Sequence, residues 1–309
     1  MDFLRRGRGE RFKPLPDQEL EKLPDDVWHK CLGCRELLYD KDLEANVWVC
    51  PRCGYHHRIT VHERIAMLSD EGSFVETNHA LRSLDPLEFT IRDRSYKDRL
   101  LQAEKDAGVS EAVVTGVATL DGVPISLAVM VMEYLGGAVG SVAGEKITRA
   151  VERAHQDGRG LVIVSQSGGM RMHEGLFSLM QMAKTSGALA RLQQAKLPFI
   201  SIIADQTYGG ATASWVALGD VIIAEPGARV GFSGPRVLQA IKVRLADDVQ
   251  KAEFMLQHGM IDLIVPRPQL RGTVIQFLHH FKGHMRCAAQ VVPSQANGSA
   301  GNQRRKDEK

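Results

Sequence analysis

The sequence predicts an α/β protein with a mostly parallel sheet, preceded by a small four-cysteine zinc ribbon. Apolar runs of strand length alternate with amphipathic stretches of helical length from about residue 112 to residue 286, a pattern typical of βαβ units. Four of the five cysteines fall near the N-terminus in the order C-x2-C-x15-C-x2-C. A chain of 309 residues is long enough to bury a large core.

The composition excludes two broad classes of protein. Hydrophobic residues make up 44% of the chain and charged residues 25%, as in ordinary globular proteins. A net charge of +2 argues against a strongly basic nucleic-acid-binding protein. No apolar run approaches the roughly 18 residues of a membrane span, and residues 1–12 lack the apolar stretch of a secretory signal. We therefore expect a cytoplasmic protein with no membrane contact.

The cysteine spacing indicates one structural metal. Thiolates two residues apart can bind a single ion from a tight turn, and two such turns complete a tetrahedral zinc site. Disulfides are the alternative, but the spacing and the expected reducing compartment argue against them. The predicted ligands are Cys31, Cys34, Cys50 and Cys53. Four thiolates leave no open position, so the zinc should be structural. The fifth cysteine, Cys287, we interpret as a small hydrophobic residue.

Changes in composition divide the chain into four parts. We expect a flexible segment at 1–27, the zinc ribbon at 28–55, an α/β body at 56–286 and a disordered, polar tail at 287–309. The body should begin with a charged, mostly helical connector that runs to about residue 110.

The elements of the body follow from their periodicity. Two adjacent strands, 112–119 and 123–132, should be joined by the turn Asp121-Gly122. The remaining elements are expected as helix 145–156, strand 161–164, helix 176–194, strand 199–203 and strand 221–224. At the start of the longer helix, apolar side chains recur at helical spacing, and we expect this stripe to lie in the core. It comprises Met172, Leu176, Leu179, Met180 and Ala183.

Three glycine-rich turns lie where predicted strands end. They contain Gly136-Gly137, Gly168-Gly169 and Gly209-Gly210. None matches the phosphate-binding loop or the dinucleotide fingerprint. What they share is backbone amides near predicted helix N-termini, where partial positive charge gathers. Such fixed donors can stabilise a developing oxyanion.

Side chains able to do acid–base or nucleophilic chemistry are scarce near these turns. Ser165 and Ser167 lack the G-x-S-x-G context of an activated nucleophile. Glu174 could act as a base, although a glutamate at this position is more often a helix-dipole partner. A site rich in backbone donors and poor in side-chain bases suits enolate chemistry on a thioester, with the proton acceptor supplied by the substrates.

Six segments carry a specific resemblance. They are LGGAVGSVAGEKI, SGGMRMHEG, SLMQMAKTSGALA, YGGATASWVALGD, IAEPGARVGFSGPRV and EFMLQHGMIDLIV. Together with the four-cysteine ribbon they resemble the β subunit of bacterial-type acetyl-CoA carboxylase carboxyltransferase, from about Trp28 to Arg271. Met170 stands where that family usually has alanine, and Ala138-Val139 where Ser-Met is common. Both departures leave the backbone donors in place.

The resemblance implies a crotonase-like fold, a spiral of ββα units. It implies transfer of the carboxyl group from carboxybiotin to the methyl carbon of acetyl-CoA, which yields malonyl-CoA for fatty-acid synthesis. Carboxybiotin would release CO2, its freed ureido nitrogen would take the methyl proton, and the enolate would attack the CO2. The implied partners are a carboxyltransferase α subunit in an α2β2 assembly, which would hold the ureido oxygen of biotin, a biotin carboxyl carrier protein that carries the biotin, and biotin carboxylase. Together they form an ATP-binding, biotin-dependent complex.

Roles for individual residues follow from the same resemblance. The amides of Gly168 and Gly169 would be catalytic, as donors to the thioester oxyanion. The substrate-binding and cofactor-binding positions would be Gly136, Gly137, Arg171, Gly209 and Gly210. Arg171 and Lys146 lie near the turns in sequence, but the sequence leaves open which lysine or arginine meets the phosphates of CoA.

Two alternatives stay open at the level of sequence. The first is another crotonase-type enzyme, such as a hydratase, which needs two carboxylates on one water. The second is a nucleic-acid-binding zinc ribbon whose contact patch would be Arg52, His56, His57 and Arg58. Carboxyl transfer does not require the ribbon to bind RNA, and the sequence does not exclude such binding.

Overall fold

The computed structural model describes residues 28–91, 93–246 and 248–285, and these form two compact units that meet between Arg58 and Ile59. The predictions for 1–27, for Cys287 and for the tail at 287–309 lie outside the described residues. Among the described residues, no helix combines the length and the apolarity needed to cross a membrane.

The smaller unit is built around two turns that carry the cysteines. Strand β1 (Trp28–Lys30) pairs antiparallel with β2 (Leu37–Tyr39), and the short helix α2 (Asp40–Ala45) follows. The Cys31 amide donates to the Glu36 carbonyl and closes the first turn at 2.8 Å. The second turn is closed in the same way by a bond of 2.8 Å from the Cys50 amide to the Tyr55 carbonyl.

The four cysteine sulfurs lie together at zinc-ligand spacing. All four Sγ atoms lie within 4.8 Å of one another. The Cys31–Cys53 sulfurs are 3.7 Å apart and the Cys34–Cys50 sulfurs 3.9 Å. Thiolates at the usual zinc–sulfur distance on a tetrahedron would be about 3.8 Å apart, whereas a disulfide needs about 2.05 Å. The four side chains therefore fit one tetrahedral zinc ion, and the disulfide alternative does not fit.

The larger unit contains one sheet in which most strands are parallel. Its strands are β3 (Val75–Thr77), β6 (Val113–Leu120), β7 (Val123–Met130), β8 (Gly160–Ser167), β9 (Phe199–Tyr208), β10 (Val221–Ala224), β11 (Val230–Gly231) and β12 (Leu263–Ile264). The spatial order is β12-β10-β9-β8-β7-β6-β3, with β11 beside β9. Neighbours from β7 through β12 are parallel, as the alternating pattern predicted.

The antiparallel edge of this sheet begins with a tight hairpin. Strands β6 and β7 pair directly across Asp121 and Gly122. Both turn residues have positive φ, +53° and +71°, which is the conformation that two-residue hairpins with right-handed twist require. Strand β3 pairs antiparallel with the outer side of β6. The connector expected to be mostly helical thus supplies a strand to the sheet and a second small pair, β4 (Thr90–Ile91) with β5 (Arg94–Ser95).

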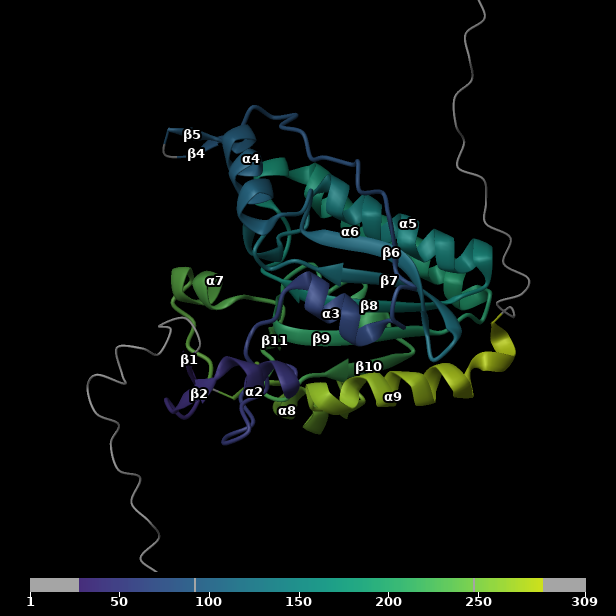
Figure 1. The fold of residues 1–309 in the computed structure, drawn as a ribbon. Helices are drawn as coiled ribbons and strands as arrows, with labels where there is room; N and C mark the ends of the chain where they lie inside the picture. The colour runs from purple at the N-terminus through teal and green to yellow at the C-terminus, as the bar shows by residue number, and fades with distance from the viewer. Residues whose placement is uncertain (1–27, 92, 247, 286–309) are drawn as a thin grey trace, which may run out of the picture. The chain divides into compact units, whose positions relative to one another are not determined.

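Helices cover the sheet of the larger unit on both sides (Figure 1). The helices of this unit are α3 (Val61–Leu68), α4 (Tyr96–Ala107), α5 (Ser141–Asp157), α6 (Leu176–Gln194), α7 (Pro235–Ala240), α8 (Ala252–Gln257) and α9 (Arg267–His280). Short 3-10 turns occur at η2 (Leu135–Gly137), η3 (Met172–Glu174), η4 (Val216–Leu218) and η5 (Lys282–His284). Helices α5 and α6 lie side by side over one side of the sheet, and α3 and α9 lie on the other. The core forms where these layers meet the strands.

The prediction that the apolar stripe at the start of α6 lies in the core is wrong. Met172, Leu176, Leu179 and Met180 are 52–71% exposed, and Ala183 is exposed as well. The buried face of α6 carries small and polar side chains instead, among them Ser178, Gln181 and Thr185. The Ser178 hydroxyl donates to the Val139 carbonyl, in the turn before α5, at 2.7 Å, and the Thr185 hydroxyl donates within α6 to the Gln181 carbonyl at 2.9 Å. This buried face allows α5 to approach closely, because Gly144 of α5 lies directly against Gln181.

A buried ion-pair triad fastens α3 and α9 to the end of β10. Glu225 accepts from Arg64 of α3 at 2.7 Å and from Arg267 of α9 at 2.8 Å and 2.9 Å. All three side chains are 3% exposed or less. Burial alone would raise the pKa of Glu225, but the two guanidiniums hold that pKa well below its usual range. The carboxylate therefore stays charged and joins elements that are distant in sequence.

The ribbon geometry generates a prediction about metal content. Cys31→Ser should reduce zinc from one ion per chain to almost none and unfold the smaller unit, because binding contributes on the order of 10 kcal/mol in zinc-ribbon-sized peptides. The larger unit has its own core and should stay folded. Elemental analysis, with limited proteolysis of the full chain, measures both effects.

The matched control is Leu32→Ser in the same turn, whose side chain is 73% exposed. It should retain the metal and the resistance to protease. Zinc retained at full occupancy in Cys31→Ser, or lost equally in Leu32→Ser, would contradict the four-cysteine assignment.

Candidate active site

Three glycine turns meet at the carboxyl ends of the adjacent parallel strands β7, β8 and β9. The turn after β7 holds Gly136-Gly137, the turn after β8 holds Gly168-Gly169, and the turn after β9 holds Gly209-Gly210. The Gly168 amide donates to the Gly136 carbonyl at 2.9 Å. A Cβ placed on Gly209 would lie 3.1 Å from the Gly169 Cα. The parallel sheet thus brings together glycines that are spread over 75 residues of sequence, from Gly136 to Gly210.

Four of these six glycines have a positive φ, among them Gly137 and Gly169. Gly137 has a φ of +64°, and a Cβ there would overlap the Gln166 carbonyl oxygen. Gly169 has a φ of +110°, which side-chain-bearing residues rarely adopt, although the space around it is open to 3.6 Å. Gly137 therefore permits close approach of two turns, whereas Gly169 permits an unusual backbone direction.

The hydrogen bonds of the turns correct the predicted set of oxyanion donors. The amide of Gly168 is engaged by Gly136, and that of Gly169 donates to Ser167 Oγ at 3.1 Å. The amides of Gly137 and Gly209 donate to Tyr134 and Gly231 carbonyls at 3.0 Å and 3.1 Å. Within residues 28–91, 93–246 and 248–285, the amides of Gly136 and Gly210 have no acceptor. The amides of Gly168 and Gly169, both predicted as oxyanion donors, thus have acceptors within the chain, and the amides without an acceptor lie on the two turns that flank the β8 turn.

The helix N-termini are also not where the sequence suggested. No helix opens at Met170 and Arg171 in the described chain, since these residues are followed by the 3-10 turn η3 and α6 begins only at Leu176. After the β9 turn comes the 3-10 turn η4 instead of an α-helix. Helix α5, which begins at Ser141, is the long helix that directly follows a glycine turn. A helix dipole therefore supports the first turn more than the other two.

Arg171 and Lys146 do not have the exposure that phosphate binding requires. Arg171 is 1% exposed and forms ion pairs with Glu111 and Glu174. Lys146 is also 1% exposed and donates to Ser110 Oγ at 2.9 Å. Burial lowers the pKa of Lys146. Arg171, predicted as a cofactor-binding residue, and Lys146 are therefore both internal cations that present no exposed group to a phosphate.

The carboxylates near the turns are occupied too. Glu174 is fully buried and accepts from Tyr96 Oη at 2.6 Å and from the Ser141 amide at 2.5 Å. Glu111 is fully buried and accepts from Ser83 Oγ and from its neighbour Ala112's amide. A hydratase would need two carboxylates that share one water, and neither side chain has an exposed oxygen to offer. This arrangement does not favour the hydratase alternative.

The two serines at the end of β8 are structural. Ser165 Oγ accepts from the Trp215 indole at 3.1 Å, and Ser167 Oγ donates to the Gly137 carbonyl at 2.7 Å. Both serines are fully buried. Neither has a histidine partner among its described hydrogen bonds, so neither is an activated nucleophile.

The nucleic-acid alternative loses part of its contact patch. His57 of the ribbon is 3% exposed, with its ring 4.9 Å from the rings of His29 and Tyr55. Arg52 and Arg58 are exposed, and His56 is half-buried. The predicted four-residue patch is therefore reduced to two exposed arginines.

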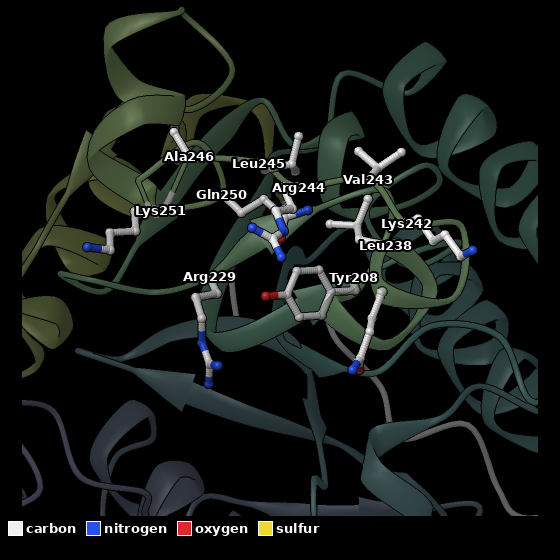
Figure 2. Close-up of a pocket in the computed structure, with 11 residues that line it drawn as sticks. Tyr208, Arg229, Leu238, Lys242, Val243, Arg244, Leu245, Ala246, Gln250 and Lys251 are labelled. Carbon is white, nitrogen blue, oxygen red and sulfur yellow. The ribbon is translucent and has the colours of Figure 1, made fainter.

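A cavity of about 710 Å³ opens beside the turn after β9 (Figure 2). Tyr208, the residue before Gly209, lies at its centre, with Lys242 and Lys251 on opposite sides. The described residues that line it include four cations and no acidic side chain: Arg229, Lys242, Arg244 and Lys251. Arg229 is paired with Asp205 at 2.6 Å. The cavity therefore offers a positive environment next to the glycine turns.

Sequence reasoning missed the residues of this cavity and the partners of Arg171. Three of the cavity cations follow β11 and Arg229 precedes it, and none of them matches a motif. Glu111 precedes Arg171 by 60 residues. The one available signal for the cavity was the run of three basic residues at 242–251 without the periodicity of a long helix.

Two protein-family descriptions match the chain. The acetyl-CoA carboxylase zinc finger domain matches residues 28–53, and the carboxyl transferase domain matches residues 56–269. The two matches fall on the smaller and the larger unit, respectively.

Solved structures agree in fold. A transcarboxylase 12S structure with methylmalonyl-coenzyme A and methylmalonic acid bound is 25% identical, with a TM-score of 0.61, covering 77% of this chain and 42% of that one. A Pseudomonas malonate decarboxylase heterodimer is similar in fold, at 23% identity and a TM-score of 0.56, covering 72% and 86%.

Curated relatives are considerably closer in sequence. The acetyl-coenzyme A carboxylase carboxyl transferase subunit beta of Pelotomaculum thermopropionicum is 48% identical over 87% of this chain and 94% of its own length. That of Prochlorococcus marinus is 48% identical over 89% and 94%. With two matching domains, a shared crotonase-like α/β fold and relatives of this similarity, the chain belongs to the family of acetyl-CoA carboxylase carboxyl transferase β subunits.

Proposed function

We propose that this chain forms the acyl-CoA half of a divided carboxyltransferase site in the cytoplasm. A carboxyl group would pass from carboxybiotin on a separate carrier protein to acetyl-CoA, within an ATP-binding, biotin-dependent complex. The observation that carries the proposal is the meeting of three glycine turns that present two unengaged amides, at Gly136 and Gly210. The nearby carboxylates are buried in ion pairs with Arg171, so the chain contributes donors instead of a base.

The two amides match the charge that carboxyl transfer develops. Removal of a proton from the methyl group of acetyl-CoA places negative charge on the thioester oxygen. A fixed amide on either of the turns that flank the β8 turn can donate to such an oxygen without reorganisation. Gly169 lies between them and determines the direction of the backbone through its positive φ. Biotin, when bound, would supply the carboxyl group and accept the methyl proton, which accounts for a site without its own base.

The cavity next to Tyr208 suits the other end of the same substrate. CoA carries phosphates on its adenosine moiety, and exposed cations bind phosphates through charge-assisted hydrogen bonds. Lys242, Arg244 and Lys251 are exposed and have no ion pair among the described residues. A ligand with its phosphates in this cavity could extend past Tyr208 to place its thioester at Gly209-Gly210. These three cations are our proposed phosphate ligands, a question that the sequence left open.

The exposed apolar face of α6 fits the α subunit as its occupant. Leu176, Leu179 and Met180 are each more than half exposed, and a contiguous apolar patch of this kind marks an interaction site. The same helix reaches the active site, because the Met182 sulfur lies against Gly210. A subunit seated on this face would therefore cover the glycine turns and could complete the site with its own groups.

The first test concerns Gly169. In the complex with an α subunit, Gly169→Ala should lower kcat by about 10²–10³-fold, since a side chain at this φ redirects the turn between the two donor amides. The assay is malonyl-CoA-dependent carboxylation of free biotin. Gly227→Ala, at a φ of +68° in an open turn, is the positive-φ control and should keep its kcat. Near-normal turnover in a folded Gly169→Ala enzyme would refute the oxyanion assignment.

The second test concerns the cavity. Replacing both Lys242 and Arg244 by glutamine should weaken binding of CoA at least tenfold, because each charge-assisted hydrogen bond contributes about 1.5–3 kcal/mol. Calorimetry with CoA and with its dephosphorylated 3′ form measures the loss. Lys105→Gln, an exposed cation on α4, is the control for net charge. Equal CoA affinity in the double variant and the wild type would mean that the phosphates bind elsewhere.

The third test concerns the partner. Leu176→Glu combined with Met180→Glu should abolish association with the α subunit and, with it, carboxyl transfer, while the melting temperature of the isolated chain changes little. Light scattering of the mixed subunits measures the assembly. Leu101→Glu on α4, at a side chain 60% exposed, is the matched control and should assemble normally. Normal assembly of the α6 variant would move the interface to another face.

A further inference from the structure

A cluster of buried polar side chains lies directly behind the first glycine turn. We call it the Arg171 cluster; its members are Arg171, Glu111, Glu174, Ser83 and Tyr96. The guanidinium of Arg171 forms an ion pair with Glu111 on one side and with Glu174 at 3.3 Å on the other. Nη1 also donates to Ser83 Oγ and Tyr96 Oη, each at 3.0 Å. The side chains of Arg171, Glu111 and Glu174 have no exposed surface.

This cluster holds the backbone of the first glycine turn at two points. Arg171 Nε and Nη2 donate to the Ala138 carbonyl at 3.1 Å and 2.7 Å. Glu174 Oε2 accepts from the Ser141 amide at 2.5 Å. Ala138 and Ser141 bracket the segment that joins Gly136-Gly137 to α5. The conformation of this segment therefore depends on a guanidinium and a carboxylate from the neighbouring turn.

The cluster also joins the connector to the site. Ser83 and Tyr96 belong to the segment before the first long strand, whereas Arg171 and Glu174 follow β8. Tyr96 Oη donates to Glu174 at 2.6 Å, and burial raises the pKa of this phenol far above its usual range. The hydroxyl thus remains a donor over the whole range of assay pH. Glu174 is therefore held by a phenol that does not titrate in that range.

The backbone of Gly140 leaves room for this arrangement. A Cβ on Gly140 would overlap Glu174 Oε1 and lie 2.7 Å from Arg171 Nη1. The φ of Gly140 is −97°, so an alanine there meets no backbone strain. Gly140 therefore lacks a side chain only because the cluster occupies that space. Gly140→Ala is a second substitution that should disturb the cluster, and it changes no charge.

We propose that Arg171 and Glu174 are positioning residues for carboxyl transfer, which fix the turn that presents the Gly136 amide to the thioester oxygen. The catalytic part of this inference rests on the proposed function. The structural part does not: it is the clamp formed by the hydrogen bonds from Arg171 and Glu174 to the first glycine turn. Neither side chain touches the substrate. They act through the Ala138 carbonyl and the Ser141 amide, and an error of about 1 Å in the position of a donor can cost about 10²-fold in rate.

The test compares two equally buried arginines. Arg171→Lys keeps the charge but loses the planar fork that reaches Ala138 and Glu111 together. Arg64→Lys makes the same change in the Glu225 triad, where Arg64 is also 1% exposed. In the complex with an α subunit, Arg171→Lys should lower kcat about 10²-fold with little change in KM for acetyl-CoA. Arg64→Lys should lower the melting temperature to a similar degree and keep its kcat.

A double-mutant cycle with Gly140→Ala separates positioning from general loss of stability. Gly140→Ala should also lower kcat with KM unchanged. Combined with Arg171→Lys it should add little further loss, because both changes disrupt one clamp. The positioning role would be overturned if the kcat losses of the two single variants multiplied in the double variant. It would also be overturned if Arg64→Lys lowered kcat as much as Arg171→Lys.

Hydrogen exchange on the isolated chain gives a readout that needs no activity. Amides of peptides that cover 135–141 should exchange faster in Arg171→Lys than in the wild type, and at the wild-type rate in Arg64→Lys. Unchanged exchange in Arg171→Lys would overturn the clamp whatever the enzyme does. Faster exchange together with an inactive wild-type complex would instead refute the proposed function and leave the clamp intact.

Discussion

The buried guanidinium of Arg171 is the interaction on which the rest of the site depends. A charge with no exposed surface is costly unless opposite charges and hydrogen bonds compensate it, and here Glu111, Glu174 and the Ala138 carbonyl do so together. Removing one partner would leave the others buried and unpaired. The arrangement is therefore satisfied only when the connector, the first glycine turn and the turn after β8 are all in place. A site made of backbone amides needs such a constraint, because its donors have no side chains of their own to hold them.

Local periodicity was sufficient to predict the fold but not the surface of each element. The strand 221–224 and the helix 176–194 coincide with β10 and α6, since both patterns are carried by neighbouring residues. The apolar stripe of α6 was assigned to the core and lies outside it. An apolar face indicates contact with some apolar surface, and the sequence of one subunit does not say whether that surface belongs to the same chain. The inner face can be polar because the hydroxyls of Ser178 and Thr185 both donate to backbone carbonyls, of Val139 and Gln181, and these small side chains allow close helix packing.

The candidate site was predictable in kind, and less so in its individual residues. Three glycine pairs after three strands had to meet once the strands were parallel neighbours. Which amides stay available depends on carbonyls of adjacent turns, so the engagement of Gly168 by Gly136 could not be read from either turn alone. The sequence predicts Arg171 as a cofactor-binding residue, because it follows the Gly168-Gly169 turn. Its actual partners, Glu111 and Ser83, precede it by 60 and 88 residues and carry no motif.

The distribution of groups explains why a single chain would hold only part of the chemistry. Cations gather in the cavity next to Tyr208, unengaged amides flank the turn after β8, and exposed apolar side chains run along α6. The cations suit the phosphate end of an acyl-CoA, which is always anionic. The amides suit the thioester end, whose oxygen becomes anionic only during reaction. The third has no counterpart on the substrate, and leaving it in water is unfavourable. An α subunit on α6 would bury that face, exclude water from the amides and so strengthen their interaction with the enolate. On this reading, assembly and catalysis depend on the same helix, because Met182 of α6 packs against the Gly210 turn that its exposed face adjoins.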